Sequence, residues 1–167
     1  MAGSETVAEV RRVGVSGHQS LAPATRDLVA QAIRAELKRL GPFVGVTSLA
    51  LGADQIFAKE VLRAGGALHV IVPCANYRTS FQDDEGRRSF DELLSLARSS
   101  TQLPFEQPSE EAYMAAGRAV VDDSELLLAV WDGEPAAGLG GTADVVAYAN
   151  ERQRAVRIVW PAGASRR

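Results

Sequence analysis

The sequence predicts an α/β domain with a three-layer α/β/α Rossmann-like fold, in which a mostly parallel, doubly wound sheet lies between two layers of helices. Short apolar stretches alternate along the chain with stretches whose apolar residues have helical spacing. Continuously apolar strands are typical of parallel strands that are covered on both faces. Because strand–helix–strand crossovers are right-handed, this alternation gives a doubly wound sheet.

Length and composition fit a single domain. The chain has 167 residues, of which 46% are hydrophobic, enough for one ordinary core. We expect one domain over residues 10–162, with residues 1–9 and 163–167 as flexible termini. The formal net charge is −3 and no long basic run is present, which does not favour nucleic acid as a partner.

Cysteine and histidine usage exclude several kinds of site. Cys74 is the only cysteine, so no internal disulfide can form, and a reducing cytoplasm suits the chain. His18 and His69 are far apart in sequence and form no recognisable metal-ligand set with it. No apolar run approaches the roughly 20 residues that a membrane helix needs. We expect a cytoplasmic protein with no membrane contact, metal or cofactor.

The first half of the chain should contain three strands and two helices. The first helix has one apolar stripe and stops at Gly41-Pro42, and the second ends before Gly65-Gly66. The expected strands are 10–16, 43–47 and 67–72, and the expected helices are 23–40 and a second one that ends near residue 64.

The second half is less regular at its start. Residues 76–88 are polar and are expected to form a surface loop. Ser109, followed by two glutamates, is expected to cap a helix. The other expected elements are a helix over 90–97, strands over 100–105, 125–131 and 156–160, and a last helix over 144–154.

Three loops rich in glycine or serine follow strands of this sheet. They are Ser16-Gly17-His18, the stretch 48–54, and the stretch 132–142, which carries Gly140-Gly141-Thr142. Loops after parallel strands lie at the carboxyl edge of the sheet, where ligands bind. Glycines allow close backbone approach, and a helix N-terminus favours an anion. We therefore expect a nucleotide or phosphate ligand, although tight packing would also need small residues there.

The common nucleotide signatures are missing. The first strand offers only Gly14-Val15-Ser16-Gly17 in place of Gly-x-Gly-x-x-Gly, and Thr47 and Ser48 stand where an acidic residue would follow the second strand. No Gly-Lys-Ser/Thr phosphate loop is present. A standard dinucleotide or P-loop site is therefore not expected.

Two motifs carry a resemblance to known families. The stretch Ser48-Leu49-Ala50-Leu51-Gly52-Ala53-Asp54, followed by a helix and Gly65-Gly66-Ala67, resembles the signature of the DNA-processing protein A (Smf) family. Gly140-Gly141-Thr142 resembles the phosphate loop of the LONELY GUY phosphoribohydrolases. Both families belong to the SLOG superfamily of Rossmann-like, nucleotide-handling domains, which the chain resembles from about residue 12 to 161.

The resemblance implies catalytic residues as well as a fold. The phosphoribohydrolases have a glutamate three residues after the threonine, and here that position is Val145, with Asp144 one residue earlier. They also use an arginine on the preceding helix, where Arg118 stands. In an enzyme of this kind Asp144 or Asp132 would stabilise developing charge on the ribose, and Arg118 would hold phosphate.

Each candidate ligand-binding residue has a structural alternative. Thr142 is expected to bind phosphate or to cap its helix, and Asp54 and Asp144 to contact ligand or to complement a helix dipole. The other candidates have ordinary roles in turns or in the core as alternatives. The full set of candidate ligand-binding residues is Ser16, Gly17, His18, Ser48, Gly52, Asp54, Trp131, Asp132, Gly140, Gly141 and Thr142.

These observations favour binding or sensing of a nucleotide or nucleotide-derived phosphate ligand. The alternative is cleavage of the N-glycosidic bond of a nucleoside monophosphate, and a weaker one is single-stranded DNA binding, as the Smf resemblance implies. The sequence leaves open whether the ligand is only bound or also cleaved. Apolar helix faces that contain alanine and glycine would suit a homodimer or ordinary core packing.

Overall fold

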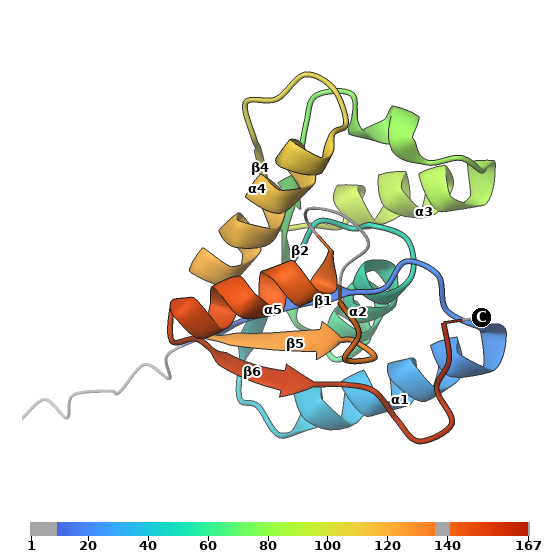
Figure 1. The fold of residues 1–167 in the computed structure, drawn as a ribbon, viewed down its shortest axis with the longest axis vertical. Helices are drawn as coiled ribbons and strands as arrows, with labels where there is room; N and C mark the ends of the chain where they lie inside the picture. The colour runs from blue at the N-terminus through green and yellow to red at the C-terminus, as the bar shows by residue number, and fades with distance from the viewer. Residues whose placement is uncertain (1–9, 136–140, 167) are drawn as a thin grey trace, which may run out of the picture.

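The sheet is six-stranded, and every strand pair in it is parallel in the part of the chain that the structure describes. A computed structural model describes residues 10–135 and 141–166. The strand order is β4-β3-β2-β1-β5-β6 (Figure 1). The strands are β1 (Arg11–Gly17), β2 (Phe43–Thr47), β3 (Ala67–Val72), β4 (Ser99–Gln102), β5 (Leu126–Val130) and β6 (Ala155–Ile158).

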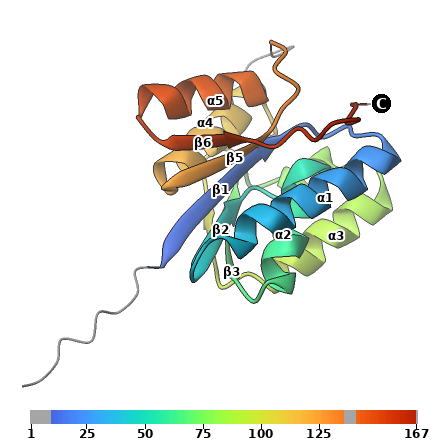
Figure 2. The ribbon, with the colours of Figure 1, turned by 90° about the horizontal axis from the view of Figure 1, so that it is seen from below.

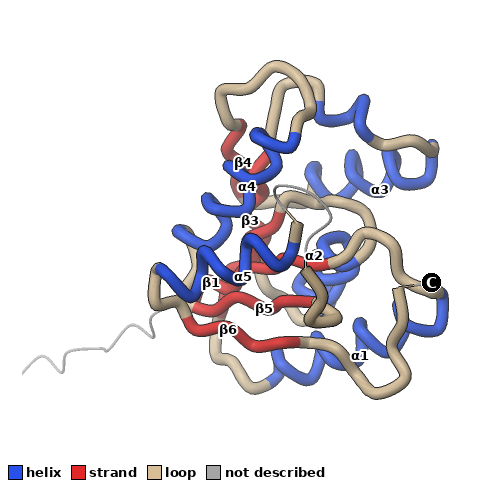
Figure 3. Tube along the Cα trace, in the orientation of Figure 1, coloured by secondary structure: helices blue, strands red, loops and turns tan. Residues whose placement is uncertain are grey.

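Helices cover both faces of the sheet, which confirms the predicted three-layer Rossmann-like fold. Figure 2 shows α1, α2 and α3 on one face and α4 and α5 on the other. The tube view separates the strands from the helices in front of and behind them (Figure 3). The helices are α1 (Pro23–Lys38), α2 (Ala53–Arg63), α3 (Asp84–Ser95), α4 (Glu110–Asp122) and α5 (Thr142–Glu151), with a short 3₁₀ helix, η1 (Tyr77–Ser80).

The core has two parts, one on each face of the sheet. The larger part packs α1, α2 and α3 against the strands, and its buried side chains include Ile33 and Phe57. The smaller part lies under α4 and α5 and includes Val120 and Val145. Gly117 brings the last two helices together, because a Cβ there would lie 2.7 Å from Val145 Cγ2.

The prediction of a surface loop over 76–88 is wrong. The segment contains η1 and the first turn of α3, and Tyr77 and Phe81 within it are buried. The Asp83 side chain caps α3 by accepting a hydrogen bond from the Gly86 N–H at 2.6 Å. The residues at this helix start are polar because they face solvent and because acidic side chains there interact favourably with the helix dipole. The same polarity is typical of a surface loop, which is why the sequence predicted one.

The C-terminal segment lies against α1. The Ser165 N–H donates to Thr25 Oγ1 at 2.8 Å, and the Ser165 carbonyl accepts from the Ala22 N–H at 3.3 Å. These two bonds bring Arg166 back to the carboxyl edge of the sheet, although we expected 163–167 to be a flexible terminus.

Candidate functional site

A cavity of about 510 Å³ lies at the carboxyl edge of the sheet, between the ends of β1 and β5. After β1 the chain turns to α1 on one face, and after β5 it turns to α5 on the other face. This is the topological switch point, where α/β sheets hold ligands, and the volume lies within the roughly 300–1,000 Å³ of small-molecule sites.

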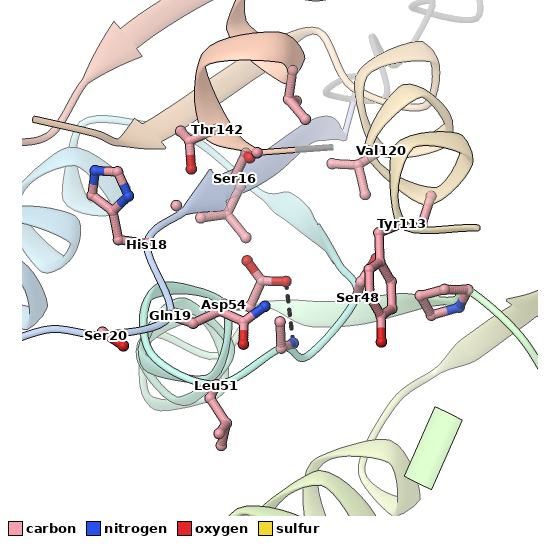
Figure 4. A pocket seen from close by; sticks show the side chains of 18 of the residues that line it. Ser16, His18, Gln19, Ser20, Ser48, Leu51, Asp54, Tyr113, Val120 and Thr142 are labelled. Atoms are coloured by element: carbon pink, nitrogen blue, oxygen red, sulfur yellow. Dashed lines mark hydrogen bonds between the residues drawn. The ribbon is translucent and has the colours of Figure 1, made fainter. Parts of the chain in front are cut away.

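The cavity gathers many of the residues that the sequence singled out. Its lining includes parts of all three predicted loops, together with η1 and α4 (Figure 4). Gly140 lies outside the described residues. Gly52 and Asp132 lie in the predicted loops and Trp131 ends the expected strand before the third loop, and none of the three lines the cavity. The predicted residues that line it are Ser16, Gly17, His18, Ser48, Asp54, Gly141 and Thr142.

The N-terminus of α5 offers the cavity an anion site. Gly141 is the N-cap residue and has no side chain to accept from the first-turn N–H groups, and Thr142 follows it with 8% of its surface exposed. A helix start of this kind presents backbone N–H groups and a positive partial charge. Arg166 is the only lysine or arginine among the described residues that line the cavity. The Arg166 guanidinium also lies 3.8 Å from Asp132 Oδ2, and three acidic residues share the lining, Asp54, Glu110 and Glu134. The N–H groups of this helix start and Arg166 are therefore the groups of the lining that are complementary to an anion.

The loop between β2 and α2 has a different role from the one predicted. Leu49 holds a left-handed conformation at φ 58°, and its N–H donates to Thr47 Oγ1 at 3.0 Å. The next N–H, that of Ala50, donates to Asp54 Oδ2 at 3.2 Å. The loop thus forms a small anion-binding concavity, and the chain's own carboxylate occupies it.

Burial dominates the acidity of Asp54. It raises the pKa of the carboxyl to about 7, although the N–H groups of Ala50 and Ser48 and the Thr47 hydroxyl act in the opposite direction. Only 8% of the residue's surface is exposed. The group therefore titrates near neutral pH while it lines the cavity.

The glycines nearest α2 are explained by packing. Gly52 has φ 76°, and a Cβ there would lie 2.4 Å from the Gln19 carbonyl oxygen and 2.5 Å from that of His18. At Gly17 a Cβ would lie 2.4 Å from Ala53 Cβ. The loop after β1 therefore presses against the start of α2, and Gly52 allows this contact, where the sequence suggested close approach to a ligand.

His18 joins the ends of β1 and β5. Its Nε2 accepts the backbone N–H of Asp132 at 3.0 Å and lies 3.2 Å from Asp132 Oδ1. Burial and the nearby Arg166 lower the pKa of His18 more than Asp132 raises it. We therefore assign a neutral ring whose lone pair takes the backbone N–H, with the imidazole packed edge-on to Trp160 at 5.6 Å between ring centroids.

Two further predicted residues stabilise the loop that follows β5. Trp131 donates its ring N–H to the Glu134 carbonyl at 2.8 Å, and Asp132 Oδ1 accepts the Glu134 N–H at 2.9 Å. Trp131 is thus held by the loop and does not line the cavity where a base could stack on it.

The catalytic pair that the resemblance implied is not brought to the cavity. The Arg118 guanidinium lies 5.5 Å from the ring centroid of Tyr148, whose hydroxyl donates to Asp122 at 2.9 Å. Asp144 lies in the first turn of α5, where its N–H donates to the Gly141 carbonyl at 3.1 Å. Neither Arg118 nor Asp144 is part of the cavity lining.

One wall of the cavity is aromatic, and sequence reasoning expected only Tyr77 of its residues at the site. Tyr113 on α4 lines the cavity beside Tyr77 and Phe81, with 6.3 Å between the ring centroids of the two tyrosines. Glu110 lies three residues before Tyr113, on the same helix face. Tyr113 could have been found from its inward-facing position on the predicted helix, but packing in the core explains that position equally well. Arg166 gave no signal, because nothing in the sequence brings the tail to the sheet.

A second hollow, of about 700 Å³, lies at the opposite edge, where β2 and β3 begin. Its buried carboxylate, Glu60, is held in a bidentate pair by Arg34 at 2.9 and 3.0 Å, which lowers the pKa of Glu60. Lys38, Arg63 and Arg98 also line this hollow, so its lining carries an excess of positive charge, but none of the three predicted loops reaches this edge. We therefore place the candidate site at the carboxyl edge.

Two further features were searched for in the described residues. No group of three or more metal-ligating side chains comes together in residues 10–135 and 141–166. None of the helices described there is both long enough and apolar enough to cross a bilayer.

Comparison with known proteins identifies the fold. No protein-family model and no curated protein matches the sequence. DNA processing protein A of Streptococcus pneumoniae is similar in structure, with a TM-score of 0.66 and 20% identity over 89% of this chain and 50% of that one. DNA processing protein A of Helicobacter pylori, described for its single-stranded DNA binding mode, gives a TM-score of 0.63 and 18% identity over 89% of this chain and 64% of that one.

A molybdenum cofactor binding protein from the phototrophic bacterium Rippkaea orientalis is also similar, with a TM-score of 0.57 and 17% identity over 90% of this chain and 77% of that one. The chain spans less than two thirds of either DNA processing protein. These likenesses show the three-layer α/β/α fold, and two of them are to DNA processing protein A, whose family the sequence resembles. Because a single-stranded DNA-binding protein shares it, the fold does not support our expectation against nucleic acid.

Proposed function

We propose that this chain binds or senses a nucleotide, or a nucleotide-derived phosphate ligand, in the cavity at the carboxyl edge of the sheet. The observation that carries the proposal is the meeting of an anion site and an aromatic wall in one cavity. Gly141, Thr142 and Arg166 supply the first, and Tyr113 and Tyr77 border the second. Phosphate and a stacked base would be held together by such a pair of surfaces.

The positions of the two candidate catalytic groups support binding without turnover. The carboxylate and the guanidinium that the phosphoribohydrolase alternative requires lie outside the cavity lining. Incubation with nucleoside 5′-monophosphates should therefore yield no free base. Release of base that disappears in Asp144→Asn would replace the binding proposal with the hydrolase.

The direct test is affinity for nucleoside 5′-monophosphates, measured by calorimetry and by thermal stabilisation. Gly141→Asp should abolish binding, because it places a negative charge where phosphate would lie. Gly41→Asp is the matched control, since Gly41 lies at the opposite edge and a Cβ there meets no atom within 4 Å. Unchanged affinity in Gly141→Asp would show that the glycine loop is only a turn.

Single-stranded DNA is tested in the same series. A chain that holds DNA mainly through its phosphates loses affinity steeply with added salt. One cationic side chain in the described lining predicts a shallow salt dependence. Native mass spectrometry of the purified protein would show a retained ligand and the subunit count together, and so test the proposed homodimer. A cytoplasmic location, expected from the single cysteine, belongs to the same proposal.

A further inference from the structure

Asp54 is the one acidic side chain of the described lining that is buried and at the same time faces the cavity. Figure 4 shows its carboxyl group in the middle of the site, with the Ala50 N–H bonded from the side of the β2–α2 loop. The carboxylate fills the anion-binding concavity of that loop, so a phosphate group cannot use it. Phosphate must bind at the other end, by Thr142 and Arg166.

Asp54 lies between the proposed anion end and the aromatic wall of the cavity. In Figure 4 it lies between Thr142 and Ser16 on one side and Tyr113 on the other. A nucleotide with its phosphate at Thr142 and its base at Tyr113 would place its sugar over Asp54. An ionised carboxylate only accepts hydrogen bonds, and the ribose hydroxyls are donors.

We infer that Asp54 accepts hydrogen bonds from the ribose hydroxyls of the bound nucleotide, and that the site therefore selects ribonucleotides over 2′-deoxyribonucleotides. This inference rests on the proposed function and names the sugar that the site takes. A hydrogen bond to a charged group contributes about 1.5–3 kcal/mol, so loss of the 2′-hydroxyl weakens binding about tenfold or more.

The selectivity depends on pH through Asp54. Its pKa is about 7, and hydroxyl donors favour the ionised form, so the preference for ribose is full above pH 7 and declines below it. The other titratable or charged groups that line the cavity are His18, Tyr77, Glu110, Tyr113, Glu134 and Arg166. Their titration changes the affinity for a ribonucleotide and for its 2′-deoxy form equally, and so does titration of the phosphate, whose second pKa is near 6. The ratio of the two affinities therefore reports the contribution of the 2′-hydroxyl alone.

The experiment compares the 5′-monophosphates of adenosine, guanosine and cytidine with their 2′-deoxy counterparts, by calorimetry at pH 8 and pH 5.5. Wild-type protein should bind at least one ribonucleotide about tenfold or more tightly than its deoxy form at pH 8, and the ratio should fall toward one at pH 5.5. Asp54→Asn should lower the ratio at pH 8 and remove its dependence on pH, because the amide oxygen is an uncharged and weaker acceptor. Asp27→Asn, on the exposed face of α1, should keep the wild-type ratio.

Each outcome decides between the proposals. Equal affinity for both sugars at pH 8 would overturn the role of Asp54 and leave nucleotide binding intact. A preference for ribose at pH 8 that is as large in Asp54→Asn as in wild type would also overturn it. If no nucleotide of either series binds, both proposals are wrong. Should Asp54→Asn fail to fold, the pH dependence of the wild-type ratio decides alone, because a ratio that does not change between pH 5.5 and 8 contradicts the inference.

Discussion

Replacing Asp54 by asparagine should stabilise the unliganded protein at alkaline pH. Burial raises the pKa of this carboxyl from 3.8 to about 7. A carboxyl with a raised folded-state pKa contributes its full stability below pH 3.8 and loses it as the pH rises through 7. At about 1.4 kcal/mol per pKa unit, the free energy of unfolding loses about 3 kcal/mol from Asp54 between pH 4.5 and pH 8.

An asparagine side chain carries no charge, so the variant escapes this loss. Its amide oxygen can still accept the Ala50 N–H, which in wild type is bonded at 3.2 Å. The stability of Asp54→Asn relative to wild type should therefore rise by about 3 kcal/mol from pH 4.5 to pH 8, equivalent to roughly 10 °C in melting temperature for a chain of this size.

The assay is urea unfolding of wild type and variant at both pH values. Paired carboxyls with lowered pKa, such as Asp91 and Glu60, change stability in the opposite direction, but they do so in both proteins and cancel in the difference. Asp27→Asn should show a difference that is flat with pH. The free energy of unfolding of Asp54→Asn relative to wild type should not stay constant or fall from pH 4.5 to pH 8. Either result would refute the assignment of a buried carboxyl with a raised pKa.

Three other substitutions test separate parts of the structure. Gly52→Ala should cost more than about 2 kcal/mol, because it adds a contact with backbone carbonyls to the left-handed strain, whereas Gly65→Ala, at φ 83° with open space, should cost about 1 kcal/mol; equal losses on urea unfolding would contradict the packing explanation. Arg34→Ala should destabilise the protein above pH 5, because it leaves the buried Glu60 with only the longer ion pair to Arg63 at 4.0 Å, and the loss should shrink as the pH falls below the usual pKa of glutamate; a pH-independent loss would point to packing alone. Arg118→Ala should leave nucleotide affinity within about twofold, because the guanidinium stacks on a tyrosine outside the cavity; a tenfold loss in calorimetry would return Arg118 to the site.

The layers of the fold were predictable because each strand and helix has its own local signal. The strand at 43–47 is buried at every residue and reads as one apolar run. Ser109 caps its helix through the Ala112 N–H at 3.0 Å, as a serine before two glutamates suggests. The prediction for the segment around Tyr77 was wrong because two aromatic residues in a polar stretch give no helical or strand periodicity. Their burial depends on Phe90 of α3 and Tyr113 of α4, which only tertiary packing brings near.

The site was predictable to the level of loops but not of individual groups. Strand alternation places the loops after β1, β2 and β5 at one edge, so Ser16, Ser48 and Thr142 meet in one cavity. The sequence does not show which glycine faces a ligand and which faces another loop, and Gly52 belongs to the second kind. Nor does it show that the C-terminal segment brings Arg166 to this edge. That position depends on the two hydrogen bonds of the Ser165 backbone to the start of α1.

The β2–α2 loop shows why a phosphate-type motif need not bind phosphate. Its backbone has the form of an anion-binding concavity, but Asp54 follows closely enough to place its own carboxylate there. In the proposed binding mode that carboxylate takes the place of phosphate at one of the three predicted surfaces, and the start of α5 and Arg166 form the anion end. The same substitution of carboxylate for phosphate gives the cavity a hydrogen-bond acceptor at its centre. A site built in this way distinguishes ligands by the donors that they present to Asp54, and its selectivity can change with pH near neutrality because that acceptor titrates there.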